Sequence, residues 1–303
     1  MSFADWIAVD WGTSRLRVWA MGPDSAVLAA ASSDDGMGKL ARDGFEPALL
    51  ALVGGWLAPG RVTPVVACGM VGARQGWVEA AYLTTPCPPL DAARMTLAPT
   101  RDPRLSVRII PGICQMTPAD VMRGEETQIA GCLAADPAFD GVLCLPGTHT
   151  KWARVSAGEL VSFQTFMTGE MFALMSDQSV LRHSLTQPGF DDAAFDGTLS
   201  DAIANPGRIA AQLFTLRAES LLSGLGAAAA RARLSAWLIG IELASARPYW
   251  LGQRVAIIGA GGLSATYARA LAAQGASATV LDGDAMTLGG ISAATRQLKD
   301  DPT

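Results

Sequence analysis

Residues 6–20 read WIAVDWGTSRLRVWA, and this stretch determines how the rest of the chain is interpreted. Residues 6–10 form a short apolar run that ends in an acid, and residues 15–20 alternate between polar and apolar side chains. Such alternation is typical of a half-buried strand, and a Gly-Thr turn between two strands predicts a β-hairpin. We therefore expect a hairpin whose turn contains Gly12 and Thr13.

The same pattern occurs again in the middle of the chain. Residues 142–145 form a second apolar run, residues 146–150 (PGTHT) indicate a turn, and residues 151–155 indicate a return strand. This repetition indicates an internal duplication and predicts an α/β protein with two similar lobes. We expect an N-terminal lobe at 1–118 and a C-terminal lobe at 119–303, with the last helix able to return to the first lobe.

Composition limits the class of protein. The chain has 303 residues, of which 50% are hydrophobic and 17% charged, so it can build more than one core and is not a disordered protein. The formal net charge of −5 has the wrong sign for a general nucleic-acid binder. No apolar stretch reaches the ~18 residues that a membrane span needs.

Cysteine usage indicates the cellular compartment. The five cysteines show no C-x-x-C spacing, which argues against a disulfide scaffold and against a zinc ribbon. Free cysteines of this kind are typical of a reducing compartment. We expect a cytoplasmic protein with small-molecule partners, and neither a nucleic acid nor a membrane as a partner.

The first candidate site is the turn of the N-terminal hairpin. Gly12 lets a phosphate approach the backbone, and Thr13 and Ser14 add hydroxyl groups beside the turn amides. Asp10, at the end of the strand, is placed to hold Mg²⁺ directly or through water. The alternative is that Asp10 only accepts hydrogen bonds within the turn.

The second candidate site is the turn of the middle hairpin. Gly147 and Thr148, with Lys151, make a loop that is chemically suited to a phosphate. Lys151 is one of only three lysines among 23 basic residues. The alternative is an ordinary surface turn, in which His149 bonds the backbone.

The third candidate site is VAIIGAGGLS at residues 255–264. A buried strand, a glycine turn (Gly259, Gly261 and Gly262) and a helix N-terminus together favour nucleotide binding. A dinucleotide site of the Rossmann type is the weaker interpretation. Its third glycine position is occupied by Ser264, and too little chain follows residue 282 for a further strand and crossover.

Two further segments carry candidate substrate groups. In RGEETQ, at residues 123–128, Glu125 or Glu126 could act as general base toward a substrate hydroxyl, or both could simply complement a helix N-terminus. In the glycine-rich segment 69–77, Arg74 could hold a substrate carboxylate with two hydrogen bonds, or lie in an ordinary loop.

In sequence order, these motifs resemble the sugar kinase/actin/Hsp70 superfamily. The residues of these motifs are similar to those of the 2-dehydro-3-deoxygalactonokinase family. The segments that carry the resemblance are DWGTS at 10–14, GARQGW at 72–77, RGEETQ at 123–128 and PGTHTKW at 146–152. The resemblance extends from about residue 5 to about residue 290.

The resemblance implies two ribonuclease-H-like lobes in an actin-like ATPase fold, with an ATP cleft between the lobes. It also implies Mg²⁺-dependent transfer of the ATP γ-phosphate to the 6-hydroxyl of 2-dehydro-3-deoxy-D-galactonate, with adenosine held at the late glycine turn. Glycerol-kinase-type enzymes carry Gly-Asp-Gln where this chain has Gly124-Glu125-Glu126, so the base would be a glutamate. We take Glu125 as the base.

The remaining expectations concern substrate contacts and rival functions. We expect Arg74, Ser14 and Glu126 to contact the sugar acid, and the chain could form a homo-oligomer. One alternative is a nucleotide-dependent regulator of the actin/Hsp70 type that has no sugar substrate. The other is a dinucleotide-dependent oxidoreductase built on the glycine turn.

Overall fold

The computed structural model of the chain describes residues 3–300 and divides them into two compact units. Unit 1 comprises residues up to Asp140, Val155–Ser162 and the chain from Asp282 onward, and unit 2 comprises Gly141–Arg154 and Phe163–Leu281. Each unit contains a sheet and helices, so the predicted α/β class is confirmed.

Unit 1 is built on a six-stranded sheet with the order β3-β2-β1-β4-β7-β6. The strands are β1 (Trp6–Trp11), β2 (Leu16–Met21), β3 (Val27–Ser33), β4 (Thr63–Gly69), β6 (Thr96–Leu97) and β7 (Leu105–Ile109). The β1–β2 hairpin is antiparallel, as predicted, and β4 and β7 follow in parallel with β1. A small second sheet has the order β5-β8-β9, with β5 (Tyr82–Thr84), β8 (Gly112–Met116) and β9 (Ala119–Met122).

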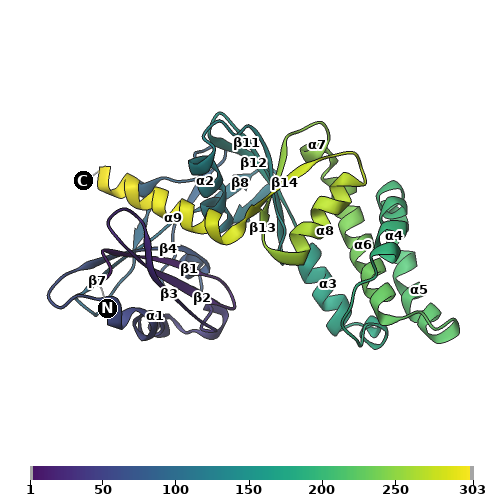
Figure 1. The fold of residues 1–303 in the computed structure, drawn as a ribbon, viewed down its shortest axis with the longest axis horizontal. Helices are drawn as coiled ribbons and strands as arrows, with labels where there is room; N and C mark the ends of the chain where they lie inside the picture. The colour runs from purple at the N-terminus through teal and green to yellow at the C-terminus, as the bar shows by residue number, and fades with distance from the viewer. Residues whose placement is uncertain (1–2, 301–303) are drawn as a thin grey trace. The chain divides into compact units, whose positions relative to one another are not determined.

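Alternation along the central strands gives the six-stranded sheet two buried faces. Ile7, Val65 and Val107 lie in one core with helix α1 (Phe45–Val53). Their neighbours on the opposite face form a second core with helix α9 (Gly283–Asp300). Helix α2 (Glu125–Ala135) packs along α9, which crosses this face of the sheet (Figure 1). Packing on this face of the sheet therefore places the N-terminal ends of α2 and α9 near the end of β1.

Unit 2 repeats this sheet order. Its five-stranded sheet runs β12-β11-β10-β13-β14, which matches β3-β2-β1-β4-β7 position by position. The strands are β10 (Gly141–Leu145), β11 (Thr150–Ser156), β12 (Glu159–Phe166), β13 (Val255–Gly259) and β14 (Ala278–Asp282). Because β13 pairs in parallel with β10 as β4 does with β1, the duplication predicted from the two hairpins extends to the topology of a ribonuclease-H-like lobe.

The helices of unit 2 surround a core that includes Trp152, Tyr267 and Trp250. They are α3 (Thr168–Asp177), α4 (Asp192–Ala204), α5 (Ile209–Leu222), α6 (Ala227–Ser245), α7 (Arg247–Trp250) and α8 (Gly261–Ala272). Helices α3, α4 and α5 all contact the long helix α6 (Figure 1). The sequence interpretation did not predict helix α4, which lies between polar turns.

The structure differs from the sequence expectation in its domain boundary. The expected boundary lies at residue 118, whereas unit 1 extends to Asp140 because α2 packs against α9 and so belongs to the first unit. In unit 2, Thr168 is the first residue of helix α3, and its hydroxyl donates to Glu242.

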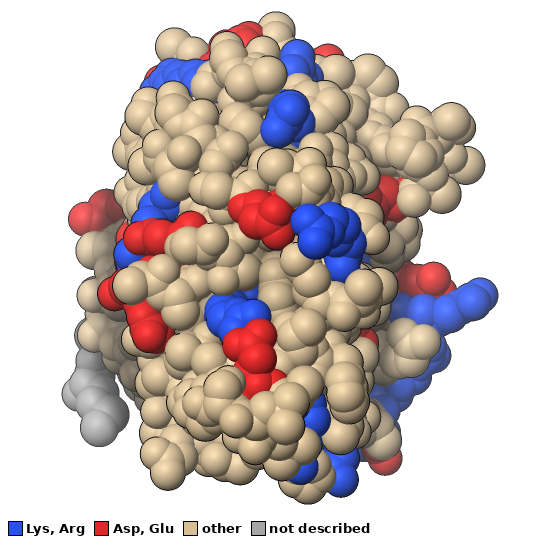
Figure 2. Space-filling model, turned by 90° about the vertical axis from the view of Figure 1, so that its right-hand side faces the viewer, with Lys and Arg blue, Asp and Glu red and all other residues tan. Residues whose placement is uncertain are grey.

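Within residues 3–300, no helix combines the length and apolarity that a membrane crossing requires. On the face drawn in Figure 2, basic and acidic side chains of the described residues lie near one another across the centre, and several basic side chains adjoin along the right-hand edge.

Candidate active site

A hollow of about 180 Å³ in unit 1 brings together residues from four of its segments. Asp10 and Gly12 come from the first hairpin, and Glu125 comes from the first turn of α2. The rest of the lining is Gly69, Met70, Arg123, Gly124, Gln128 and Thr287. The motifs at 10–14 and 123–128, which are more than 100 residues apart in the sequence, therefore line the same hollow.

Asp10 is the only carboxylate of the hairpin that lines this hollow, and Arg17 holds it. Arg17 lies opposite Asp10 in the β1–β2 register, and its Nε donates to Asp10 Oδ2 at 3.1 Å. Arg17 also pairs with Asp284 at the start of α9. Within the described chain, the other oxygen, Asp10 Oδ1, has one donor, the weak thiol of Cys68 at 3.8 Å. One carboxylate oxygen is thus left for a further ligand.

The site offers Mg²⁺ a single carboxylate ligand rather than a protein cage. Among the described residues, no cluster of three or more His, Cys, Asp or Glu side chains could enclose a metal ion. Mg²⁺ does not need such a cage, because it keeps several waters and is held by one or two carboxylates together with substrate phosphates. Asp10 Oδ1 is a suitable ligand of this kind, directly or through water.

The turn of the first hairpin presents unused backbone donors. The N–H of Gly12 closes the turn onto Arg15 O at 2.9 Å, but no hydrogen bond within the described chain uses the N–H groups of Thr13 and Ser14. Both residues are exposed. The turn is supported from behind by Gly36, where a side-chain Cβ would lie 2.3 Å from Thr13 O. Only glycine permits this approach, so the loop at Gly36 fixes the shape of the turn.

Glu125 and Glu126 have different environments. Glu125 lines the hollow and accepts a hydrogen bond from the N–H of Arg123 at 3.0 Å. Glu126 is fully buried and accepts from the N–H of Gly124 at 2.7 and 2.8 Å and from the hydroxyl of Thr127 at 3.1 Å. Burial, and next the neighbouring charge of Glu125, raise the pKa of Glu126 to about 7. Glu125 is therefore the glutamate placed to meet a ligand.

The two arginines of this region also differ. The side chain of Arg74 is 81% exposed, its Nε lies 3.9 Å from Glu79 Oε2, and it is not part of the hollow. Arg123 does line the hollow. Its guanidinium lies 4.3 Å from the ring centroid of Tyr82 and donates to Ala80 O at 2.8 Å. Arg123 thereby ties the segment after Arg74 to the start of α2.

In unit 2, a pocket of about 470 Å³ opens beside the second hairpin. Gly147 and Thr148 of the hairpin turn line it, and Phe172 and Phe190 contribute aromatic rings. The other lining residues are Thr168, Gly169, Arg231, Ser235, Leu238, Ile239, Leu263, Thr266 and Tyr267. A pocket that combines aromatic and aliphatic side chains with several polar groups has the character of a site for a small molecule with an aromatic ring.

The second hairpin turn repeats the construction of the first. No hydrogen bond of the described residues uses the N–H groups of Gly147 and Thr148. Glycine again supports the turn, because a Cβ on Gly169 would lie 2.3 Å from Gly147 O. The N–H of Glu170 donates to Thr148 O at 2.9 Å, and His149 pairs with the carboxylate of Glu170. Helix α3 therefore holds this turn in place.

A buried carboxylate lies behind the pocket. Glu242, on α6, is 1% exposed and accepts hydrogen bonds from Trp152 Nε1 at 2.8 Å, from Tyr267 at 2.7 Å and from Thr168. Burial raises the pKa of Glu242 to about 7, although the three hydrogen bonds oppose the shift. Thr168 and Tyr267 both line the pocket, so Glu242 fixes two of its walls.

The remaining candidate residues of unit 2 do not line the pocket. Gly259 ends β13 and Gly261 and Gly262 begin α8, so the predicted strand, turn and helix are present. Leu263, the next residue, lines the pocket, whereas the three glycines do not. Lys151 is 5% exposed and is likewise absent from the lining.

The sequence interpretation missed Arg17, Arg123 and Glu242. Arg17 could have been found from the hairpin register, because a six-residue antiparallel pair places it opposite Asp10. Glu242 could have been found as a single acid within the apolar run 236–244. Phe172 and Phe190 carry no such signal, because only the fold brings them to Gly147.

Comparisons with known proteins agree on one family. A family model described as 2-keto-3-deoxy-galactonokinase matches residues 10–294. A relative from Rhizobium meliloti (strain 1021), named as a probable 2-dehydro-3-deoxygalactonokinase, is 41% identical over 96% of each chain. The 2-dehydro-3-deoxygalactonokinase of Escherichia coli (strain K12) is 35% identical over 95% of this chain and 96% of its own.

Solved structures are similar as well. A structure from Sinorhizobium meliloti, provisionally assigned as a 2-dehydro-3-deoxygalactonokinase, has a TM-score of 0.88 at 42% identity and covers 97% of this chain and 99% of its own. An activator of 2-hydroxyisocaproyl-CoA dehydratase from Clostridium difficile, solved with bound ADPNP, has a TM-score of 0.50 at 12% identity, with 98% and 97% coverage. This second likeness shows the fold alone. The comparisons do not favour a regulator without a sugar substrate or an oxidoreductase.

Proposed function

Because the chain belongs to the 2-keto-3-deoxy-galactonokinase family, we propose that it transfers the γ-phosphoryl group of ATP to the 6-hydroxyl of 2-dehydro-3-deoxy-D-galactonate. The observation that carries the proposal is the hollow in unit 1. It places a carboxylate suited to Mg²⁺ (Asp10), a phosphate-type turn (Gly12) and an accessible carboxylate (Glu125) around one small space.

Glu125 is the proposed general base. Its carboxylate lines the hollow, and the N–H of Arg123 orients one of its oxygens at 3.0 Å. A positioned base removes the proton from the substrate hydroxyl as the hydroxyl oxygen attacks phosphorus, which typically contributes ~10²–10⁴-fold to the rate. Glu126 supports Glu125 indirectly, because its buried carboxylate binds the N–H of Gly124 at the start of α2.

Asp10 is the proposed ligand of Mg²⁺, and Arg17 its positioning residue. Bound Mg²⁺ supplies neutralisation of the charge on the transferring phosphoryl group. Arg17 restrains Asp10 by bonding Oδ2, which leaves Oδ1 as the oxygen proposed to bind the metal. The unused N–H groups of Thr13 and Ser14 could each donate a hydrogen bond to a phosphate oxygen. We also propose that Ser14 contacts the sugar acid.

The pocket of unit 2 is the proposed nucleoside site. Its aromatic and aliphatic walls suit the adenine ring, and the unused N–H groups of Gly147 and Thr148 suit the phosphate chain. We propose that Gly259, Gly261 and Gly262 border the nucleoside and that Lys151 acts electrostatically from beneath the hairpin. Phosphoryl transfer needs little covalent work from the protein, so positioning by these groups is sufficient.

Arg74 is the proposed partner of the sugar-acid carboxylate. Its guanidinium is exposed, and its one carboxylate neighbour, Glu79, is too distant at 3.9 Å for a hydrogen bond. The fork of N–H groups is therefore available to a planar carboxylate. Arg123 anchors the segment that carries Arg74 through its bond to Ala80 O.

The experiment that tests the proposed function is a coupled ADP-release assay against a panel of 2-dehydro-3-deoxy sugar acids. We expect ADP release to require the sugar acid and to be fastest with the galactonate epimer. A nicotinamide-dependent turnover, or ADP release of equal rate without any acid, would overturn the proposal.

A further inference from the structure

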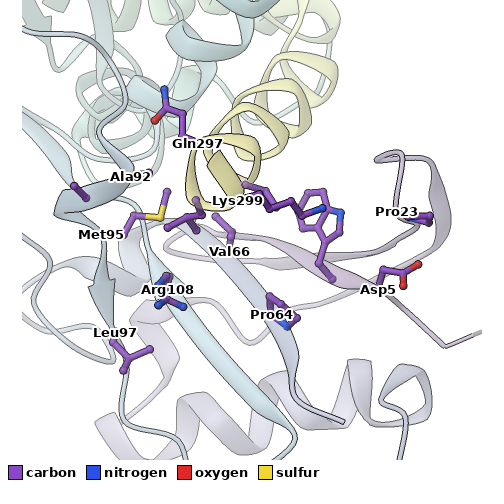
Figure 3. Close-up of a pocket in the computed structure, with 14 residues that line it drawn as sticks. Asp5, Pro23, Pro64, Val66, Ala92, Met95, Leu97, Arg108, Gln297 and Lys299 are labelled. Atoms are coloured by element: carbon purple, nitrogen blue, oxygen red, sulfur yellow. The ribbon is translucent and has the colours of Figure 1, made fainter. Parts of the chain in front are cut away.

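A second cavity of unit 1 lies apart from the hollow of Asp10 and shares no lining residue with it. It has a volume of about 760 Å³ and is bounded by the six-stranded sheet and by the last turns of α9 (Figure 3). Nothing in the proposed kinase reaction uses this cavity. Its volume falls within the ~300–1,000 Å³ range of small-molecule sites.

The sheet geometry explains why particular side chains meet there. Trp6 on β1, Val66 on β4 and Arg108 on β7 lie on the α9 face, because their neighbours Ile7, Val65 and Val107 belong to the core of the opposite face. Val66 and Arg108 are also direct partners in the parallel register of β4 and β7. Strand alternation therefore directs an indole, an aliphatic group and a guanidinium to one side of the sheet.

Helix α9 closes this space with a second cation. Lys299 projects from the end of α9, across Val66 from Arg108, and Met95 lies beside them (Figure 3). Leu298, also on α9, adds an apolar surface to the lining. The cavity thus has an apolar floor and two basic side chains on different elements.

Three polar groups of the lining, on Trp6, Arg108 and Lys299, have few or no partners, whereas the hydroxyl of Thr295 donates to Ile291 O at 2.9 Å. Trp6 is 1% exposed, and its Nε1–H has no hydrogen-bond acceptor in the described part of the chain. Arg108 makes one long bond, to Ser106 Oγ at 3.4 Å, and neither Arg108 nor Lys299 forms an ion pair with another described residue. Asp5 is the one carboxylate of the lining, and it already faces Arg61 Nη1 at 3.6 Å.

A buried donor without a partner is destabilising, so an acceptor at this place would be favourable. Two cations that lack ion-pair partners among the described residues, beside an apolar surface, suit an anion with an apolar body. We propose that this cavity is a second binding site, for a small organic anion. Its carboxylate or phosphate group lies between Arg108 and Lys299, one of its oxygens accepts from Trp6 Nε1–H, and its apolar part covers Val66 and Met95.

The test uses fluorine NMR of the full chain labelled with 5-fluorotryptophan. The chain has eight tryptophans, and Trp6→Phe identifies the resonance of Trp6. The probes are 2-naphthoate, 2-naphthyl phosphate and the neutral 2-naphthylmethanol. We expect the two anions to shift the Trp6 resonance with saturation and the neutral alcohol to bind at least ~10-fold more weakly. The tighter of the two anions identifies the head group.

Variants separate this site from non-specific binding. Arg108→Gln and Lys299→Gln should each weaken anion binding ~5–10-fold, as expected for loss of one charge-assisted bond. Lys39→Gln removes an exposed lysine of the same unit outside the cavity and should bind as the wild type does. The proposal is overturned if the Trp6 resonance does not move, if the neutral alcohol binds equally, or if the Arg108 and Lys299 variants bind like Lys39→Gln.

Discussion

Arg17 Nε donates to Asp10 Oδ2 at 3.1 Å across the β1–β2 hairpin, and the same guanidinium pairs with Asp284 at the start of α9. One arginine therefore restrains the proposed metal-binding carboxylate and connects it to a helix from the far end of the chain. Among residues 3–300, the second oxygen of Asp10 has only the thiol of Cys68 as a partner, so Arg17 orients Asp10 without using both of its oxygens.

Asp10→Asn should leave the fold intact and lower kcat by a factor of ~10² or more, because the amide cannot neutralise charge at the metal. The measurement is steady-state kinetics at saturating Mg²⁺, with circular dichroism to verify folding. Asp43→Asn, at an exposed acid of the same unit, is the matched control. Normal turnover of Asp10→Asn would mean that this carboxylate serves only the turn.

Arg17→Lys should have a smaller effect than Asp10→Asn, with kcat reduced ~10-fold and a higher Mg²⁺ concentration needed for half-maximal rate. Lysine keeps the charge but lacks the planar fork that bonds both Asp10 and Asp284. A Mg²⁺ titration of the rate measures this shift. An unchanged Mg²⁺ dependence would exclude a positioning role for Arg17.

The two glutamates of α2 should respond differently. Glu125→Gln should lower kcat ~10²–10⁴-fold with little change in KM for the sugar acid, because the amide still accepts one hydrogen bond. Glu126→Gln should keep more activity than Glu125→Gln and mainly lower stability, since its carboxylate binds the N–H of Gly124. Kinetics and urea unfolding on both variants decide the assignment, and an inactive, stable Glu126→Gln would reverse it.

Arg74→Ala should raise KM for the sugar acid at least ~10-fold, and Arg74→Lys should not restore it, because lysine lacks the fork of N–H groups. The substrate dependence of the rate at saturating ATP measures both variants. If KM stays at the wild-type value, the carboxylate is bound by another group, for which Arg123 is the first candidate because it lines the hollow.

Gly262→Val should raise KM for ATP more than KM for the sugar acid. The free protein has room for this side chain, because a Cβ at Gly262 meets no atom within 4 Å, whereas Gly261 has a φ of +69° that valine would strain. Gly207→Ala, an equally open glycine of the same unit outside the pocket, serves as the control. Equal effects on both KM values would indicate that the glycine turn is only structural.

Glu242 should make the stability of unit 2 depend on pH. The pKa of Glu242 is about 7 in the folded chain, against 4.5 for an ordinary glutamate, so the folded state retains a proton that the unfolded state has released. This group's contribution to the free energy of unfolding therefore falls as pH rises from 4.5 to 7, by ~3 kcal/mol in total. Glu242→Gln removes this dependence.

Urea unfolding of wild type and Glu242→Gln at pH 5 and pH 8 checks this expectation. The free energy of unfolding of the variant, relative to that of the wild type, should be higher at pH 8 than at pH 5. Parallel pH profiles for the two proteins would contradict the assignment. Glu219→Gln, which removes an acid paired with Arg233 near the surface, is a control for the loss of one negative charge.

The sequence predicted much of the fold because its strongest signals are local. The two hairpins and the strand, glycine turn and helix that begin at Val255 all depend on short patterns of apolar residues and turn formers. Helix α4 and strands β8 and β9 were not predicted, and they are stabilised by packing within the fold. The sequence also located Asp10 and Glu125, whose motifs are compact.

Other parts of the candidate site could not be read from the sequence. The burial of Glu126 and Lys151 depends on tertiary packing, which makes these residues less accessible than Glu125. Arg17 and Glu242 act through partners that lie 7 to 267 residues away in the sequence, and such pairs appear only when the sheets and helices assemble. The aromatic walls of the unit 2 pocket come from α3 and from the segment before α4, which carry no nucleotide motif.

The proposed reaction of the chain is phosphorylation of a sugar acid at its 6-hydroxyl. It is tested by phosphorus–proton correlation NMR of the product formed from ATP, Mg²⁺ and 2-dehydro-3-deoxy-D-galactonate, with wild type and Glu125→Gln run in parallel. We predict a single new phosphate monoester coupled to the two C6 protons, formed by the wild type and strongly reduced in the variant. Inorganic phosphate as the main product, or a phosphate ester coupled to the proton of another carbon, would show that the chain does not catalyse this reaction.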